Sequence, residues 1–115
     1  MPKKLNQSLC EACRHDAPVL TENEIQDLSP EIPSWKIFEE EEVKKLICSF
    51  TFLNYKDSVE FANKVAILAE REDHHPEIIL EWGKVTVIWW SHKIMGLHKN
   101  DFICAAKTDE IYKVN

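Results

Sequence analysis

The sequence predicts one α+β domain, in which a four-stranded antiparallel sheet is covered on one face by about three helices. Three observations support this fold class. The chain has 115 residues, 44% of them hydrophobic, which suits one compact core but not two. Helix-like and strand-like segments follow one another in the order α-β-β-α-β-β-α. Two antiparallel hairpins in such an order can merge into one sheet.

The first 18 residues are expected to form a flexible arm before a domain over 19–115, because they are polar and lack periodicity. The arm contains Cys10-x-x-Cys13 and His15. These supply at most three zinc ligands, whereas a structural zinc site uses four. We therefore interpret the two thiols as reduced and non-catalytic, and we expect no metal there.

Helix signals open the domain. Thr21 and Glu24 have the spacing of a capping box, and Ile25 and Leu28 form one apolar edge before Ser29-Pro30. A short first helix is therefore predicted.

Two strands are predicted next. One contains Trp35 and Ile37, and the other runs from Lys45 to Leu53 and includes Cys48 as a small buried residue. Four glutamates, Glu39 to Glu42, fall near their connection. Since no Asp, Asn or Gly ligand loop surrounds them, a solvated turn is favoured over a calcium site.

A second capping box, Asp57 with Glu60, predicts a helix that runs to about Glu72. Its apolar positions cover about half of the helix circumference, which is wider than one sheet contact needs. These positions are Val59, Phe61, Ala62, Val65, Ala66, Leu68 and Ala69. Ile67 lies on the polar side. Two explanations stay open: contact with another subunit, or a wide core stripe.

The second hairpin is predicted from two apolar segments, Ile78 to Trp82 and Val85 to Trp90. Gly83-Lys84 between them is predicted to be a two-residue turn. The last apolar segment, from about Lys99 to Tyr112, is predicted to be a helix that includes Cys104 as a buried residue.

The composition argues against several classes of protein. The net charge is -6 and the basic residues are scattered, which disfavours nucleic acid as the main ligand. The apolar stretches are far shorter than the roughly 20 residues of a membrane helix, so no membrane partner is expected. No secretory signal is recognised at the N-terminus, so a cytoplasmic protein is expected.

Three histidines are predicted to cluster at the open end of the second hairpin. With Gly83-Lys84 as the turn, His75 lies opposite His92 on the neighbouring strand. A slip of one residue would favour His74 as the direct neighbour of His92, and the cluster would persist.

Two carboxylates are placed to support these imidazoles. Glu70 precedes His74 by four residues, a spacing that puts both side chains on one helix face. Asp101 falls in the first turn of the last helix, where the helix dipole favours an anion.

Three interpretations of the histidine cluster compete. Three imidazoles and a carboxylate can hold zinc, but the adjacent His74 and His75 would point to opposite faces of a strand. General acid–base catalysis suits imidazole near pH 7. The third interpretation is that the histidines have no role. We disfavour this third interpretation, because an independently predicted hairpin brings three histidines together.

The spacing of these residues resembles the signature of the pterin-4a-carbinolamine dehydratases. The matching positions are Glu70, His74-His75-Pro76, Trp82, His92 and Asp101. The wider similarity covers roughly residues 20 to 112, and Cys10–Arg14 and Trp89–His92 look like the bacterial branch. Ser91 and His98 stand where many members have Thr, in the second case as the cap of the last helix.

The resemblance implies a metal-free dehydratase that removes water from 4a-hydroxytetrahydropterin to give quinonoid dihydropterin. The pterin is the substrate, so no cofactor is expected. His74 and His92 would form the acid–base pair, and His75 would bind substrate and handle protons. Glu70 and Asp101 would orient the imidazoles or the pterin. Pro76 and Trp82 belong to the same signature, although Trp82 fits hairpin packing better than pterin stacking.

Partners also follow from the resemblance. Family members form dimers or tetramers, and they recycle the pterin cofactor of aromatic amino acid hydroxylases such as phenylalanine hydroxylase. The alternative hypothesis is a non-catalytic oligomeric binding or regulatory module on the same fold.

Overall fold

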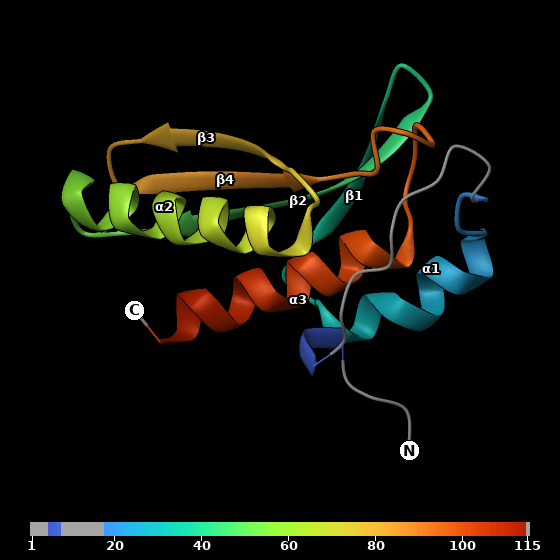
Figure 1. The fold of residues 1–115 in the computed structure, drawn as a ribbon, viewed down its shortest axis with the longest axis horizontal. Helices are drawn as coiled ribbons and strands as arrows, with labels where there is room; N and C mark the ends of the chain where they lie inside the picture. The colour runs from blue at the N-terminus through green and yellow to red at the C-terminus, as the bar shows by residue number, and fades with distance from the viewer. Residues whose placement is uncertain (1–4, 8–17, 115) are drawn as a thin grey trace.

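The structure is a computed structural model and describes residues 5–7 and 18–114. Its helices and strands follow the predicted order (Figure 1). They are α1 (Glu22–Leu28), β1 (Lys36–Glu40), β2 (Val43–Thr51), α2 (Tyr55–Glu72), β3 (Glu77–Glu81), β4 (Lys84–Trp89) and α3 (Lys99–Lys113). Two short 3-10 helices, η1 (Leu5–Gln7) and η2 (Ser29–Glu31), flank α1 along the chain.

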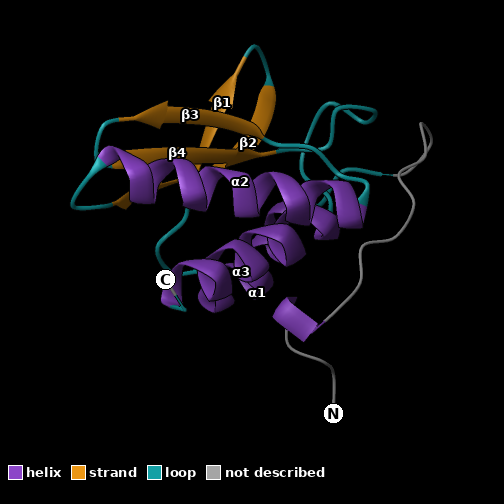
Figure 2. Ribbon diagram, turned by 60° about the vertical axis from the view of Figure 1, so that its left-hand side comes forward, coloured by secondary structure: helices purple, strands orange, loops and turns teal. Residues whose placement is uncertain are grey.

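The four strands form one antiparallel sheet in the order β1-β2-β4-β3. Figure 2 shows α1, α2 and α3 together on one side of this sheet. The predicted fold class is therefore confirmed. Because β2 and β4 are the central strands, the residues that leave β4 emerge beside the start of β3 and not at an isolated edge.

The core lies between the sheet and the helices. On β2, Leu46, Cys48 and Phe50 alternate with more exposed residues, as expected for a strand with one covered face. Their partners on β4 are Trp89, Val87 and Val85 in turn. Helix α3 contributes Phe102, Ile103, Cys104 and Ala105 to the same core. The predicted burial of Cys48 and Cys104 is confirmed.

The predicted start of α1 is confirmed and that of α2 is wrong. Thr21 and Glu24 form the expected capping box. The N-cap of α2, however, is Asn54, whose Oδ1 accepts a hydrogen bond of 2.8 Å from the backbone N–H of Asp57. Asn caps helices as well as Asp does, so the helix begins earlier, at Tyr55. Glu72 ends the helix as predicted.

The first hairpin turns at Glu41 and Glu42, which have positive φ angles of 52° and 66°. The acidic run therefore contains the turn, as expected, although Glu39 and Glu40 still belong to β1. Trp35 precedes β1 and packs in the core.

The second hairpin has a different register from the one predicted. Glu81 pairs with Lys84, so the turn consists of Trp82 and Gly83 and not of Gly83 and Lys84. Gly83 has a φ of 71°, a left-handed conformation that glycine adopts without strain. The Trp82 side chain is 72% exposed in this turn. The expectation that it packs against the hairpin is therefore wrong.

Part of the predicted N-terminal arm belongs to the domain core. Leu5 is buried, and its backbone N–H donates to Glu31 Oε1 at 3.1 Å. The Asn6 side chain donates to Glu110 Oε1 at 2.9 Å, which ties η1 to α3. The Cys10–Cys13–His15 group lies outside the described residues.

Within residues 5–7 and 18–114, none of the helices has the length and apolar character needed to cross a bilayer.

Candidate active site

The predicted site residues gather where α2 ends, β3 begins, β4 ends and α3 begins. Helix α2 ends at Glu72, and its C-cap is Asp73, a left-handed residue with a φ of 50°. This residue turns the chain, so that His74 and His75 lead into β3. Because β3 and β4 are antiparallel, the end of β4 lies beside the start of β3. Ser91 and His92 therefore leave the sheet at the same end at which His74 and His75 enter it.

His74 lies inside this junction. Its side chain is 5% exposed, and its Nε2 lies 2.6 Å from Asp101 Oδ1. The imidazole is stacked on the indole of Trp89, with 5.6 Å between ring centroids and an interplanar angle of 6°. The contact with Asp101 satisfies the buried imidazole, since burial of a polar group without a hydrogen-bond partner costs free energy.

Asp101 joins three segments of the chain. It is fully buried, and its Oδ2 accepts hydrogen bonds from the Ser91 hydroxyl at 2.8 Å and from the His98 backbone N–H at 2.9 Å. His98 in turn caps α3, because its Nδ1 accepts from the backbone N–H of Asn100 at 3.1 Å. His98 and Asp101 thus form a capping box, and the anion sits in the first helical turn as predicted.

Glu70 pairs with a different histidine from the one predicted. Its Oε1 lies 2.7 Å from His75 Nε2, and both side chains are exposed. The expected partnership with His74 at the i, i+4 spacing is wrong because the left-handed Asp73 ends the helix before His74. Pro76 then lies between the two histidines and the first residue of β3.

His92 is exposed and lies against an aromatic ring. Its imidazole is stacked on the indole of Trp90, with 4.2 Å between centroids and an interplanar angle of 16°. The Lys45 ammonium lies 4.1 Å from the centroid of the same indole. Lys45 is also paired with Glu40, at 2.8 Å.

The predicted cross-strand pairing of His75 with His92 is wrong because the turn lies one residue earlier. Extension of the observed register beyond the Glu77–Ile88 pair places Ser91 opposite His74. The shared hydrogen bonds of these two residues to Asp101 agree with that placement. The three histidines still lie at one end of the hairpin.

Trp82 is not part of this group. It lies in the β3–β4 turn, and five strand residues separate it from Pro76. An extended strand rises about 3.3 Å per residue, so the two lie about 20 Å apart.

Three residues of the site had only weak sequence signals. Trp90 stands two positions before His92, a spacing that places alternate side chains of an extended chain on one side. Lys45 could be found only once the β2–β4 register was known. Ser91 was visible only as a neighbour of His92, and its bond to Asp101 depends on α3.

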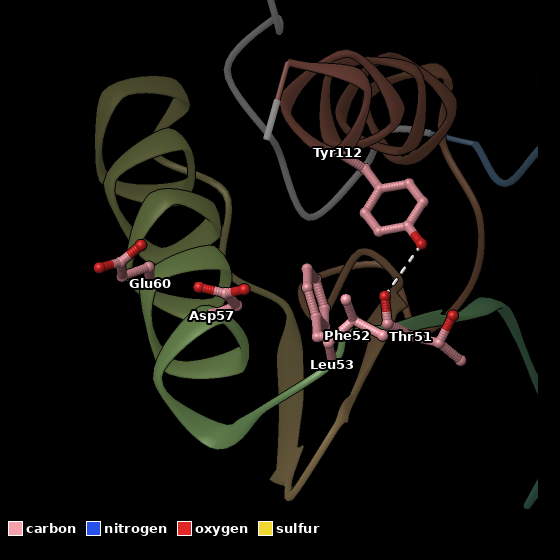
Figure 3. A pocket seen from close by; sticks show the side chains of 6 residues that line it. All are labelled: Thr51, Phe52, Leu53, Asp57, Glu60 and Tyr112. Atoms are coloured by element: carbon pink, nitrogen blue, oxygen red, sulfur yellow. Dashed lines mark hydrogen bonds between the residues drawn. The ribbon is translucent and has the colours of Figure 1, made fainter.

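A pocket of about 430 Å³ lies at the opposite end of α2, where the helix starts (Figure 3). It is lined by Thr51, Phe52, Leu53, Asp57, Glu60 and Tyr112. The Tyr112 hydroxyl donates to the Thr51 carbonyl at 3.0 Å across this pocket. None of the predicted site residues lines it.

Among the described residues, no three His, Cys, Asp or Glu side chains are grouped so that they could hold a metal ion.

Comparison with known proteins identifies the family. The family model described as pterin 4 alpha carbinolamine dehydratase matches residues 18–111. A protein of Nitrosococcus oceani named "Putative pterin-4-alpha-carbinolamine dehydratase" is 54% identical over 109 residues, which cover 95% of this chain and 96% of the relative. A protein of the same name from Photobacterium profundum is 55% identical over 105 residues, 91% of this chain and 94% of the relative.

A solved structure has the same fold. It is a crystal structure described as a transcriptional coactivator/pterin dehydratase from Brucella melitensis. The TM-score is 0.74 at 26% sequence identity, and the alignment covers 83% of this chain and 99% of the other. Sequence relatives, family model and structural neighbour agree, and the chain belongs to the pterin-4-alpha-carbinolamine dehydratase family.

Proposed function

We propose that this protein is a dehydratase that removes water from 4a-hydroxytetrahydropterin to give quinonoid dihydropterin. Family membership supports the substrate class. The observation that carries the proposal is that two exposed imidazoles, His75 and His92, lie at the same end of the second hairpin as the buried His74–Asp101 pair. Such a group of imidazoles can both give and take protons near neutral pH.

The reaction requires two proton transfers. The C4a–O bond breaks as the hydroxyl group receives a proton and leaves as water. The C4a–N5 double bond forms as the proton on N5 passes to a base. The substrate loses one water and no electrons are exchanged, so one acid and one base are sufficient.

The burial of the histidines leads us to exchange two of the roles expected from the sequence. His74 is 5% exposed and its Nε2 is engaged by Asp101. We therefore assign the proton transfers to His75 and His92, whose rings are exposed. His74 then serves to hold the junction of α2, β4 and α3 on which the other two stand.

The carboxylates orient the imidazoles in this proposal. Glu70 holds His75 Nε2, which leaves His75 Nδ1 for the substrate. A carboxylate on one ring nitrogen also fixes the orientation of an imidazole. Asp101 does the same for the buried His74. Pro76 fixes the chain direction directly after the pair.

No metal or cofactor has a role in the proposed reaction, since the pterin is itself the substrate. The proposal predicts that turnover survives a chelator. The test is the dehydration of freshly generated 4a-hydroxytetrahydropterin, followed by ultraviolet absorbance with EDTA present, for wild type and His92→Ala. Rapid wild-type turnover that is lost in the variant supports the proposal, and activity that disappears with EDTA overturns its metal-free form.

We further propose that the chain acts as a homo-oligomer, a dimer or a tetramer, and recycles the pterin used by an aromatic amino acid hydroxylase such as phenylalanine hydroxylase. Helix α2 buries Phe61, Val65 and Leu68 but leaves Ile67 63% exposed. Ile67 and the neighbouring exposed Ala66 are the apolar residues of α2 that a second copy would cover.

A second candidate is a binding module without catalysis. The Brucella melitensis neighbour is described as a transcriptional coactivator as well as a pterin dehydratase, which is the observation that favours this alternative. A folded wild-type protein that does not accelerate dehydration over buffer would support it and exclude the enzyme.

A further inference from the structure

His92 is held differently from the other two histidines. The rings of His74 and His75 are each fixed by a carboxylate, at 2.6 Å and 2.7 Å. Within residues 5–7 and 18–114, the interaction of the His92 side chain is its stack on Trp90. At 4.2 Å, this is also the shortest centroid distance among the described ring pairs.

The backbone around His92 does not by itself fix its ring. β4 ends at Trp89, and the chain then forms a short loop closed by the bridge between Ser91 and Gly96. Met95 in this loop has a positive φ of 53°. An exposed side chain on such a loop keeps its rotamer freedom unless a neighbour restricts it. The indole of Trp90 is that neighbour.

Trp90 is in turn anchored by the sheet. Lys45 lies one residue before Leu46, the partner of Trp89, so the register places it opposite Trp90. Its ammonium lies 4.1 Å from the indole centroid, a cation–π distance. The Lys45 side chain is only 11% exposed and pairs with Glu40 of β1. An ordered chain of contacts therefore runs from Glu40 through Lys45 and Trp90 to His92.

We propose that Trp90 is a positioning residue for His92 and that Lys45 fixes the indole on which the imidazole rests. This inference rests on the proposed dehydratase function. A proton-transfer group must be held close to the productive geometry, and a displacement of about 1 Å can lower a rate by about a hundredfold. The stack supplies the restraint that carboxylates supply for the other two histidines.

The test compares three variants with one matched control. Trp90→Leu removes the ring but keeps apolar bulk, Trp90→Phe keeps a ring for stacking, and Lys45→Met keeps the length of the side chain without its charge. Phe38→Leu is the control. The Phe38 ring, on β1, has its centroid 6.0 Å from the same Lys45 ammonium, but it contacts neither Trp90 nor His92 in any described ring contact. The melting temperature of each variant establishes that it is folded.

Two readouts separate positioning from mere packing. The first is the kcat and KM of pterin dehydration. The second is the chemical shift of the His92 ring protons, which an overlying indole moves upfield and which needs no activity. The His92 signals are assigned by their loss in His92→Gln.

We expect Trp90→Leu to lose the upfield shift and to lower kcat by about tenfold or more with a smaller change in KM. Trp90→Phe recovers most of both, Lys45→Met falls between them, and Phe38→Leu matches wild type. An unchanged kcat in folded Trp90→Leu, with His92→Gln inactive, overturns the inference while the proposed function stands. An inactive wild type overturns the proposed function, and the catalytic role of the stack with it.

Discussion

At the scale of single residues, the site contains two histidine–carboxylate pairs of almost equal length in opposite environments. His74–Asp101 at 2.6 Å is buried, and His75–Glu70 at 2.7 Å is exposed. Water and salt screen the electrostatic attraction within an exposed pair, so such a pair contributes little to the free energy of unfolding. A buried carboxylate is held by hydrogen bonds from the groups around it. Removal of its charge therefore weakens the interactions of each of these groups.

The first prediction compares the loss of charge in these two pairs. Asp101→Asn is expected to lower the free energy of unfolding by about 3 kcal/mol or more, because His74, Ser91 and the His98 N–H all share this anion. Glu70→Gln, the matched exposed change, is expected to cost about 0–1 kcal/mol. Urea unfolding monitored by tryptophan fluorescence measures both. Equal costs would show that burial does not separate the pairs.

The second prediction concerns pH and Asp109. Burial raises the pKa of this carboxyl above its ordinary value of 3.8, although the Trp35 indole N–H, which donates to Oδ1 at 2.9 Å, acts in the opposite direction. The folded state therefore binds the proton more tightly than the unfolded state. The stabilisation that protonated Asp109 contributes is fully present below pH 3.8 and is lost as the pH rises through the pKa of Asp109 in the folded state.

Asp109→Asn retains an acceptor for Trp35 and cannot titrate. We expect the stability of this variant relative to wild type to increase as the pH rises from about 4 to 7. Thermal unfolding of both proteins across that range measures the difference. A difference that stays constant with pH, or that decreases, would show that the Asp109 pKa is not raised in the folded protein.

At the scale of the elements, local chemistry predicted where helices and strands occur, but not their registers. Asn54 and Asp57 both fit an N-cap, and only the structure selects Asn54. Likewise, Gly83 fits either position of a two-residue turn, and a shift of one position changes every cross-strand pair by two residues. This shift is why His75 and His92 were predicted to lie directly opposite each other.

The third prediction tests the observed turn. Gly83 has a φ of 71°, and a Cβ added there would lie 3.0 Å from the Phe52 carbonyl oxygen. Gly83→Ala is therefore expected to lower the free energy of unfolding by about 1–3 kcal/mol. Gly83→Asn should cost less, because Asn adopts left-handed conformations more readily. Denaturant titration of the two variants checks the order, and a neutral Gly83→Ala would contradict the observed backbone.

At the scale of the whole molecule, the sequence predicted which residues gather at one end of the sheet, but not how they pair. The elements that carry His74, His92 and Asp101 could be ordered from sequence alone. The burial of His74 could not, because it depends on the packing of α3 against α2 and β4. The partnership of Glu70 with His75 depends on one left-handed residue, Asp73, which turns the chain directly after α2.

The fourth prediction concerns assembly. Ile67 on α2 is 63% exposed, so Ile67→Glu should change the stability of the single chain by no more than about 0.5 kcal/mol. If α2 forms the proposed contact between copies, the same change separates the oligomer. Leu53→Glu is the matched control, since Leu53 is 90% exposed but precedes the helix. Sedimentation velocity measures the oligomeric state of both variants. An unchanged oligomer in Ile67→Glu would show that this face of α2 does not form the contact between copies.

The measurement that tests the account most directly is the dehydration rate of His74→Gln, His75→Gln and His92→Gln, with the melting temperature of each. The account predicts that the exposed His75 and His92 variants keep the wild-type melting temperature and lose kcat, each by about a hundredfold or more. The buried His74 variant is expected to have a lower melting temperature than wild type. At temperatures where it is folded, it is expected to keep more of the wild-type kcat than the other two variants. A folded His92→Gln with wild-type kcat would contradict the assignment of acid–base chemistry to the exposed imidazoles.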